Sequence, residues 1–543
     1  MTADLIVTNA RVATMDGARS THEAVAVAGG RIAAVGGARE IGGLGVPDTR
    51  VIDAEGGMVL PGFQDAHCHL AESGYQLTLC DLADCDSPEA YPNTIAAYAA
   101  AHPDRPVIAG GGWAMSDFPG GVGAREALDS VVSDRPVILY SRDYHSAWVN
   151  TRALEAASIT RDTADPRGGR IERDADGNPA GTLQEKAIAL AAEMIPEPGG
   201  DERAAGLLAA QRYYHSLGIT ACQDALVDTQ WQETYERLAR NGELVLRVRA
   251  NLGWDQERDE SQLPELLARR ASGRAGRLDC GNVKFFLDGV VESHTANMLE
   301  PYLDDQRRPT AEDGVEQYPT ADINRFVELC DAEGFDVHIH TIGDRAVREA
   351  LDAFAFAVAA NGRRDARHQL AHVEFLHDDD LPRLRMLGVI SNVTPLWAHL
   401  DPYITDMTVP FVSERAARTI YRFGDIVRSG APLVFGSDWS VSTPDPLQQL
   451  AVAVSRTLPG GRPEPLDPAQ ALDLTTAIAC QTIGAAYAAR LERETGSIEP
   501  GKLADLVVLD RDLYTLEPAA YPDARVLLTL SQGAVVHTVP GWE

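Results

Sequence analysis

Eight strand-like runs are spread along the chain, and helical stretches separate most of them. The runs are Val59–Asp65, Ile219–Ala225, Leu246–Leu252, Asn282–Asp288, Asp336–Ile342, His368–Glu374, Val389–Leu396 and Pro432–Asp438. The helical stretches include Arg203–Ser216, Ile323–Glu333 and Arg345–Ala360. Strands that alternate with helices pair in parallel, and eight such units close into a barrel. The sequence therefore predicts an α/β fold, a (β/α)8 barrel of the TIM type.

Two histidines end the first of these segments, which reads Pro-Gly-Phe-Gln-Asp-Ala-His-Cys-His. Because side chains on a strand alternate between its faces, His67 and His69 point the same way while Cys68 points the other. Two imidazoles on one face can bind one metal ion, whereas burying them without a shared partner is costly. A hydrogen-bonded pair packed in the core is the alternative interpretation.

A lysine inside the fourth run is the second chemical signal. The chain has 48 lysines and arginines together, of which only Lys186, Lys284 and Lys502 are lysines, so 48 − 3 leaves 45 arginines. Burial lowers the pKa of an amine and favours its neutral form, which can add carbon dioxide to become an anionic, metal-bridging carbamate. The alternative is an unmodified Lys284 paired with an acid such as Asp288.

An ordered set of motifs resembles the amidohydrolase superfamily of metal-dependent hydrolases. The motifs are PGFQDAHCHL, DYHSAWVNTRAL (Asp143–Leu154), VKFFLDG, VHIHTIGDRAV (Val337–Val347), AHVE, FGSDWSV (Phe435–Val441) and TGSIEPGKLADLVVLD (Thr495–Asp510). More closely, the chain is similar to the amidohydrolase-3 branch, which includes N-substituted formamide deformylases. The set covers nearly the whole length and is far more specific than the histidine pair alone.

The resemblance implies a binuclear metal centre. His67 and His69 bind the first metal together with Asp438, and a carboxylated Lys284 bridges to the second metal, which His340 and His372 bind. Such ligands suit zinc, although manganese, iron or cobalt can occupy the same kind of site.

The expected reaction is hydrolysis of a non-peptide amide C–N bond, in an N-substituted formamide or N-acyl amine, by metal-activated hydroxide. Asp438 then moves the proton to the leaving nitrogen, and His145 contacts the oxyanion or the substrate, with a surface or packing role as its alternative. The pocket candidates are Trp113, Phe118, Asp288, His294, Trp397 and Trp439. Ordinary packing is the alternative for each aromatic residue, and His294 stands where relatives tend to carry an arginine.

The segments outside the barrel form two further modules in this interpretation. Strand-like Asp4–Thr14, Ala24–Val27 and Arg31–Val35 near the start, with Ala504–Leu509 and Arg525–Thr529 near the end, predict one small β-sandwich from residues 1–57 plus 485–543. Residues 58–484 then make the barrel. Residues 70–200 are far more than one helix needs, so they predict an inserted subdomain over the barrel mouth.

Charge and composition limit the partners. The formal charge is 48 − 80 = −32, which repels nucleic acid and anionic membranes. The start of the chain shows no secretory pattern and the seven cysteines are odd in number, so we expect a cytoplasmic protein without a disulfide framework. The expected partner is a small amide, and family habit suggests a homodimer.

Two other functions stay open. A mononuclear deaminase, or a hydrolase of cyclic amides, amidines or carbamates, can use the same barrel, but such enzymes usually lack the lysine on the fourth strand. A non-catalytic binding relative typically loses metal ligands, and none of the expected ligands is missing here.

Overall fold

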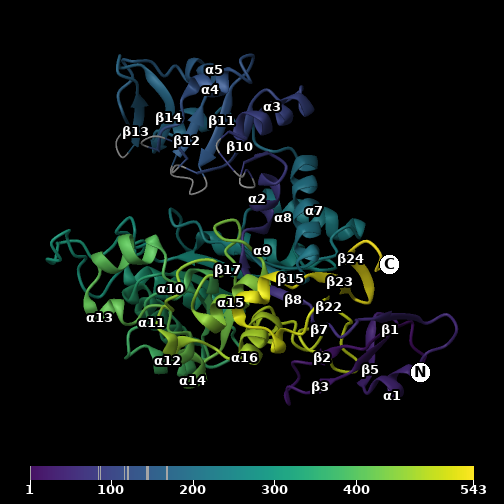
Figure 1. Ribbon diagram of the computed structural model, residues 1–543. Helices are drawn as coiled ribbons and strands as arrows, with labels where there is room; N and C mark the ends of the chain where they lie inside the picture. Colours follow the sequence, from purple (N-terminus) through teal and green to yellow (C-terminus); the bar gives the residue numbers. More distant parts are fainter. Residues whose placement is uncertain are drawn as a thin grey trace. The chain divides into compact units, whose positions relative to one another are not determined.

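The computed structural model describes residues 2–542 except 83–84, 86, 88, 115–116, 119–120, 142–145 and 167–168. The chain forms two compact units (Figure 1). The first joins Met1–Leu70 to Gln211–Glu543, and the second is Ala71–Ala210.

Eight parallel strands form the barrel of the first unit. In spatial order they are β21 (Leu433–Phe435), β20 (Ile390–Val393), β19 (Gln369–His372), β18 (Asp336–Thr341), β17 (Leu278–Phe286), β16 (Arg247–Gly253), β15 (Ile219–Val227) and β8 (Phe63–Cys68). The chain leaving β21 meets the end of β8, where Asp438 N donates to His67 O and His69 N donates to Trp439 O, both at 2.8 Å. These bonds close the barrel, so the predicted fold class is confirmed.

Helices follow the strands, as the alternating pattern predicts. The three helical stretches named above are α7 (Gly200–Ser216), α10 (Thr320–Ala332) and α11 (Asp344–Asn361). In α11 the buried residues recur every three or four positions and include Val347, Leu351 and Phe354. This spacing presents one apolar stripe to the barrel.

The first predicted strand is wrong in one respect. Val59–Asp65 reads as one run, but Met58–Pro61 forms β7 in a terminal sheet, and only β8 belongs to the barrel. Gly62 separates the two strands, and a Cβ there would lie 2.4 Å from Thr220 Oγ1. Both strands are buried on both faces, so no exposed residue marks the division.

The two ends of the chain build two sheets together. One has the order β5 (Arg31–Gly36), β4 (Ala24–Ala28), β1 (Leu5–Thr8), β6 (Arg50–Asp53), and the other β24 (Ala534–Thr538), β23 (Val526–Ser531), β22 (Leu506–Leu509), β7, β2 (Arg11–Ala13), β3 (Thr21–His22). Purple β7 pairs antiparallel with yellow β22 (Figure 1), and both sheets share one apolar core. Predicted Asp4–Thr14 divides into β1 and β2 at Asn9, whose φ is 54°.

The predicted boundary at residue 485 falls too early. Helix α17 (Ala485–Ala488) packs its alanines against Ala66, Ile390 and Val434, which lie on barrel strands or beside them. The helix therefore belongs to the barrel, and the terminal sheet resumes at β22.

The second unit has its own sheet and core. The strand order is β13 (Gly169–Arg173), β14 (Pro179–Glu185), β12 (Ser146–Val149), β11 (Val137–Ser141), β10 (Ile108–Trp113), β9 (Cys80–Asp81). The glycine run Gly110-Gly111-Gly112 lies within β10. A Cβ at Gly110 would meet Cys80 O at 2.0 Å, and only glycine permits this approach. In the described part of the chain, no helix is long and apolar enough to cross a membrane.

Candidate metal centre

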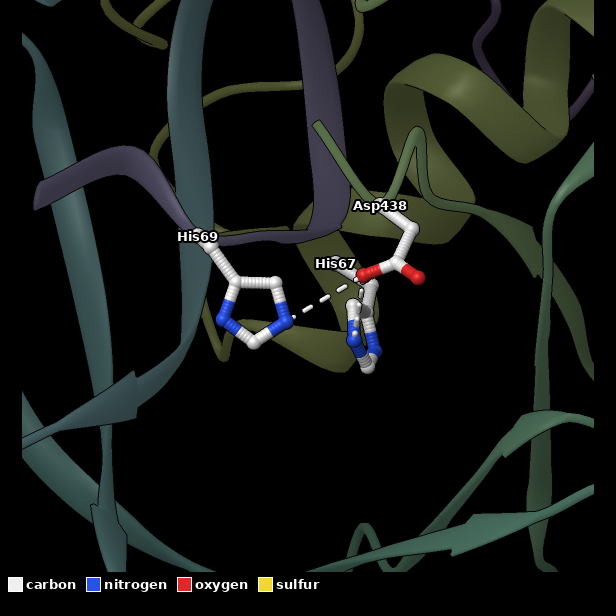
Figure 2. A group of neighbouring side chains, drawn as sticks. All are labelled: His67, His69 and Asp438. Carbon is white, nitrogen blue, oxygen red and sulfur yellow. Dashed lines mark ion pairs between the residues drawn. The ribbon is translucent and has the colours of Figure 1, made fainter. Parts of the chain in front are cut away.

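Three predicted ligands meet where β21 returns to β8. The ligand atoms of His67, His69 and Asp438 all lie within 4.8 Å of one another (Figure 2). Asp438 Oδ1 lies 3.3 Å from His67 Nε2 and 3.2 Å from His69 Nε2. Although both contacts are within ion-pair range, this buried oxygen accepts no hydrogen bond. Two nitrogens and an oxygen that converge without hydrogen bonding to one another suit a shared cation.

The remaining predicted ligands lie beside this group. The His372 ring lies 5.0 Å from the His67 ring and 4.8 Å from the His340 ring, measured between centroids. His372 Nδ1 is buried without a hydrogen-bond partner. Lys284 is 1% exposed, and its charge acts on His67 and His372. The barrel thus brings all six predicted ligands to one end, although they are far apart in the sequence.

Burial sets the protonation of these groups. It lowers the pKa of Lys284 to about 7, against a partly compensating attraction from Asp438. Burial and the Lys284 charge lower the pKa of His67 to about 3, so this ring is neutral at physiological pH. Burial opposes ionisation of Asp438, but His67 and His69 outweigh it and hold the pKa of Asp438 well below its usual value. Neutral imidazoles and an ionised carboxylate are the forms that bind metals.

Asp288 orients His340 and is not free for substrate. Its Oδ1 lies 3.1 Å from His340 Nδ1, and its carboxylate accepts backbone N–H groups of Ile342, Gly343 and Asn297. Both oxygens are therefore occupied by the protein, which corrects the predicted substrate role and argues against the alternative pairing of Asp288 with Lys284. This arrangement leaves His340 Nε2 for a metal, in the pattern that positions ligating histidines in metal sites.

Asp65 joins the first and last barrel strands. Its carboxylate accepts Ser437 Oγ at 2.6 Å, Ser437 N at 2.9 Å and Tyr214 Oη at 3.0 Å. Burial raises the pKa of Asp65 to about 6, in spite of these hydrogen bonds. These hydrogen bonds hold Ser437 in place and thereby fix the position of the next residue, Asp438. The sequence shows only an aspartate two residues before His67, and no signal of its partners.

His338 lies under the metal site and contacts a ligand. It is buried, and its Nε2 lies 3.0 Å from His67 Nδ1. The amide groups of Gln223 and Asn251 approach His338 Nδ1 at 2.9 and 3.0 Å. His338 therefore contacts the Nδ1 side of His67 and leaves His67 Nε2 facing Asp438.

The backbone is strained at two of the ligands. His372 has φ 72°, Val373 has φ 47° and Asp438 has φ 53°. A left-handed conformation is unfavourable for side chains other than glycine, and most of all for a β-branched valine. Non-glycine residues held in this region cluster at functional sites.

The aromatic candidates divide between the two units. Trp397 is partly exposed and stacks on His372, with 5.0 Å between the ring centroids. Trp439 is buried against Tyr213 and Tyr214. Trp397 therefore lies beside a predicted metal ligand, whereas Trp439 serves packing.

Other pocket candidates pack among protein side chains or lie outside the described residues. Trp113 has no exposed area and donates to Leu139 O in the core of the second unit, which corrects its predicted substrate role. Phe118 packs edge-on against Trp113 in the same core. His294 stacks on Tyr302 and lies 3.7 Å from Glu312. His145 lies outside the described residues.

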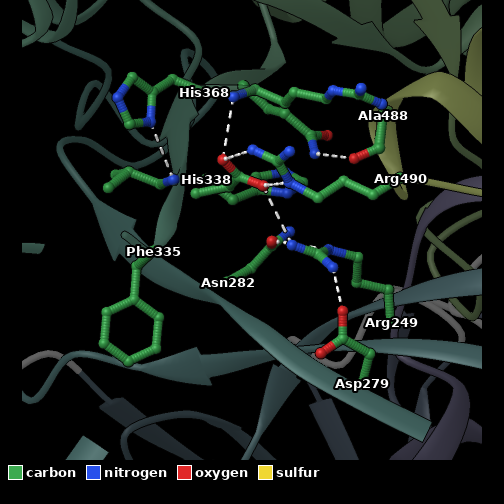
Figure 3. Close-up of polar contacts among 12 residues, drawn as sticks. Arg249, Asp279, Asn282, Phe335, His338, His368, Ala488 and Arg490 are labelled. Atoms are coloured by element: carbon green, nitrogen blue, oxygen red, sulfur yellow. Dashed lines mark hydrogen bonds and ion pairs between the residues drawn. The ribbon is translucent and has the colours of Figure 1, made fainter. Parts of the chain in front are cut away.

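A paired charge network holds the other end of the barrel (Figure 3). Arg249 donates to Asn282 at 2.8 Å, to Asp336 at 3.0 Å and to Asp279. Arg490 donates to both oxygens of Asp336, at 2.6 and 2.8 Å. Burial of Asp336 is more than offset by Arg490 and Arg249, which lower its pKa to about 2. Each charge here has its partner, so this region supports the fold.

The barrel and the cluster of metal-type ligands define a metal-dependent hydrolase. The family model described as "Amidohydrolase family" matches residues 50–537. The chain therefore belongs to the amidohydrolase family and is an enzyme that hydrolyses non-peptide carbon–nitrogen bonds.

Similar proteins match along nearly the whole chain. Protein LONG AFTER FAR-RED 3 of Arabidopsis thaliana is 31% identical over 526 residues, which cover 94% of this chain and 88% of that protein. N-substituted formamide deformylase of Arthrobacter pascens is 28% identical over 548 residues, which cover 98% of each chain. The solved structure of an uncharacterized metal-dependent hydrolase from Pyrococcus horikoshii OT3 is 26% identical, with a TM-score of 0.74, over 95% of this chain and 99% of that one.

Proposed function

We propose that this enzyme hydrolyses the amide bond of an N-substituted formamide or N-acyl amine, with two zinc or similar divalent ions. The observation that carries the proposal is the convergence of His67, His69 and Asp438 beside His340, His372 and Lys284. The formamide part rests on the similarity to the Arthrobacter pascens deformylase over the full length of both chains.

The donor set fits a divalent metal. Asp438 Oδ1 and His372 Nδ1 are buried polar atoms without hydrogen-bond partners, and such atoms are costly unless something binds them. His67, His69 and Asp438 would hold one ion. His340, oriented by Asp288, and His372 would hold the other.

Lys284 would bridge the two ions as its carbamate. Carboxylation requires a neutral amine, and burial supplies it by lowering the pKa of Lys284 to about 7. The described residues give Lys284 no hydrogen bond or ion pair, and its nearest aromatic contact is the Phe286 ring, 4.9 Å from Nζ to the centroid. A buried ammonium without a paired anion is unfavourable, whereas the negative charge of a carbamate would be balanced by the metal ions it binds.

The chain's own residues would orient the substrate and move the proton. When bound, the metal supplies Lewis acidity that polarises the amide carbonyl and lowers the pKa of water. Asp438 would accept the water's proton at its carboxylate and pass it to the leaving nitrogen. The hydrogen bonds between Asp65 and Ser437 hold the neighbouring Asp438 in place for this step. Trp397, stacked on His372, offers an apolar face to the substituent of the substrate.

A mononuclear deaminase or cyclic-amide hydrolase is the second candidate. The three-residue group His67, His69 and Asp438 favours it, since three protein ligands and one open position suffice for a single catalytic metal. Lys284 argues against it, because a single metal needs no bridge.

The test is turnover with defined metal loading. We would measure release of formate from N-alkylformamides, and of ammonia from cyclic amidines, before and after chelation and reloading with zinc or manganese. The proposal predicts formate release that depends on metal, and a loss of it in Lys284→Ala but not in Lys186→Ala. Ammonia release with full activity in Lys284→Ala would establish the second candidate instead.

A further inference from the structure

A buried carboxylate near the metal ligands has an oxygen without a partner. Glu374 lies two residues beyond His372, at the carboxyl end of β19, and is 5% exposed. Its Oε1 is fully buried and makes no hydrogen bond. Leaving a buried carboxylate oxygen unsatisfied costs free energy, so this atom calls for a donor that the described chain does not provide.

Three further acids gather around Glu374. Glu292 and Asp288 follow β17 and Asp401 follows β20, so all four carboxylates come from segments at the same end of the barrel. The charges of Glu292, Asp288 and Asp401 all act on the Glu374 carboxyl, and the Tyr421 hydroxyl hydrogen-bonds to it. Glu292 and Asp401 are only half-buried, so the group is open to solvent on their side.

Asp288 pairs with His340, but the other three acids have no basic partner within the described ranges. No ion pair joins Glu292, Glu374 or Asp401 to an arginine, lysine or histidine there, and Glu292 accepts only the neutral Thr408 hydroxyl, at 3.1 Å. Asp401 caps its own turn by accepting Ile404 N at 2.9 Å. This contrasts with the rest of a chain that carries 48 basic side chains and pairs many of its acids.

Aromatic rings border the acids. Tyr421 and Tyr302 are buried, and the charges of Glu374 and Glu292 act on both hydroxyl groups. His294 stacks on Tyr302, with 4.6 Å between centroids, and lies 5.3 Å from the Phe411 ring. Carboxylates combined with aromatic faces are the surroundings that organic cations favour.

We propose that Glu374, Glu292 and Asp401 bind a cationic group, a primary ammonium, on the N-substituent of the substrate. This inference rests on the proposed amide hydrolysis and narrows its substrate class to aminoalkyl amides. An ammonium has three N–H donors and would satisfy Glu374 Oε1 and Glu292 together. The net charge of −32 would also favour the approach of a cation.

The experiment compares two substrates of equal length. We would measure kcat/KM for N-(5-aminopentyl)formamide and for N-pentylformamide with the metal-loaded full chain. The expected preference for the cationic substrate is about tenfold or more, the usual strength of a charge-assisted hydrogen bond. Glu374→Gln and Glu292→Gln should each reduce this preference, chiefly through KM. Glu312→Gln, which removes an exposed carboxylate near His294, should retain it.

A binding measurement separates this inference from the proposed function. Titration calorimetry of the loaded enzyme with pentane-1,5-diamine should show binding that the uncharged pentan-1-ol lacks, and Glu292→Gln, at a half-buried position, should weaken it. Diamine binding without hydrolysis of either formamide would support the cation site and refute the amide reaction. Equal turnover of both formamides without diamine binding would overturn the cation site alone. Binding of Mg²⁺ or Ca²⁺ that depends on Glu374 and excludes the diamine would also overturn it.

Discussion

Both ends of the barrel carry buried charged groups, but the two ends differ in how many partners these groups have. At the amino end, Asp336 forms ion pairs with Arg249 and Arg490, and Asp331 forms ion pairs with Arg364 and His368. At the carboxyl end, Asp438 Oδ1, His372 Nδ1 and Glu374 Oε1 are buried without hydrogen bonds. Complete hydrogen bonding indicates a structural role, whereas buried polar atoms without hydrogen bonds indicate that a ligand completes the set. The contrast separates the residues that hold the fold from those that perform the chemistry.

The largest effect on activity should come from a substitution at the carboxyl end of the barrel. Asp438→Asn removes a metal ligand and the proton acceptor together, so kcat/KM should fall by about a thousandfold or more. A matched Asp445→Asn variant, a helix cap outside the metal site, should keep its activity. Retained activity in Asp438→Asn would contradict its assigned role.

A substitution at the amino end of the barrel should reduce stability and leave the metal site unchanged. Asp336→Asn leaves Arg249 and Arg490 without their buried partner, so the free energy of unfolding should fall by about 3–5 kcal/mol. Metal content per folded chain should not change. Chemical denaturation measures the loss, and Asp279→Asn is the control, since Asp279 bonds to the same Arg249 but is 42% exposed. Equal losses in the two variants would show that burial does not set the effect.

Asp288 tests the link between the fold and the metal. Asp288→Asn keeps the shape but weakens the orientation of His340, so the affinity for the second metal should fall about 10–100-fold. Competition with a chelator measures this affinity. The first metal, bound by His67, His69 and Asp438, should be retained. Simultaneous loss of both metals would mean that Asp288 supports the whole barrel end rather than one ligand.

The smallest predicted effect concerns the pH dependence of the metal-free protein. The pKa of Lys284 is lowered from 10.5 to about 7, so between these values the unfolded chain binds a proton that the folded chain lacks. Stability must therefore rise with pH across this window. Between pH 7 and pH 8.5, the free energy of unfolding of the wild type should rise by about 1–2 kcal/mol relative to that of Lys284→Met. Both proteins are measured in carbon dioxide-free buffer with chelator. A constant difference would place the lysine pKa outside this window.

The barrel and the position of its ligands could be predicted because both depend on local patterns. Buried parallel strands are apolar runs, and the reactive residues His67, Lys284, His340 and Asp438 follow or interrupt them. Parallel pairing then brings the ends of all strands together, so the convergence of distant residues follows from topology alone.

The remaining features depend on contacts that no local pattern encodes. Gly62 divides one apolar run because Thr220 approaches it from another strand. Asp288 follows a strand as a substrate-binding acid would, but three backbone N–H groups and His340 occupy it. Trp113 adjoins a glycine-rich segment typical of a loop, yet that segment is a strand in a core. Such partners come from elements distant in sequence, where a single chain gives no signal.

The most direct test of the account is the metal content of protein purified without chelators, measured by elemental analysis on the wild type and on Lys284→Ala. We predict about two ions per chain in the wild type and a clear loss in the variant, because Lys284 would join the two ions that the histidines and Asp438 hold. Wild-type protein that holds no metal, and gains no hydrolytic activity with added zinc or manganese, would contradict it.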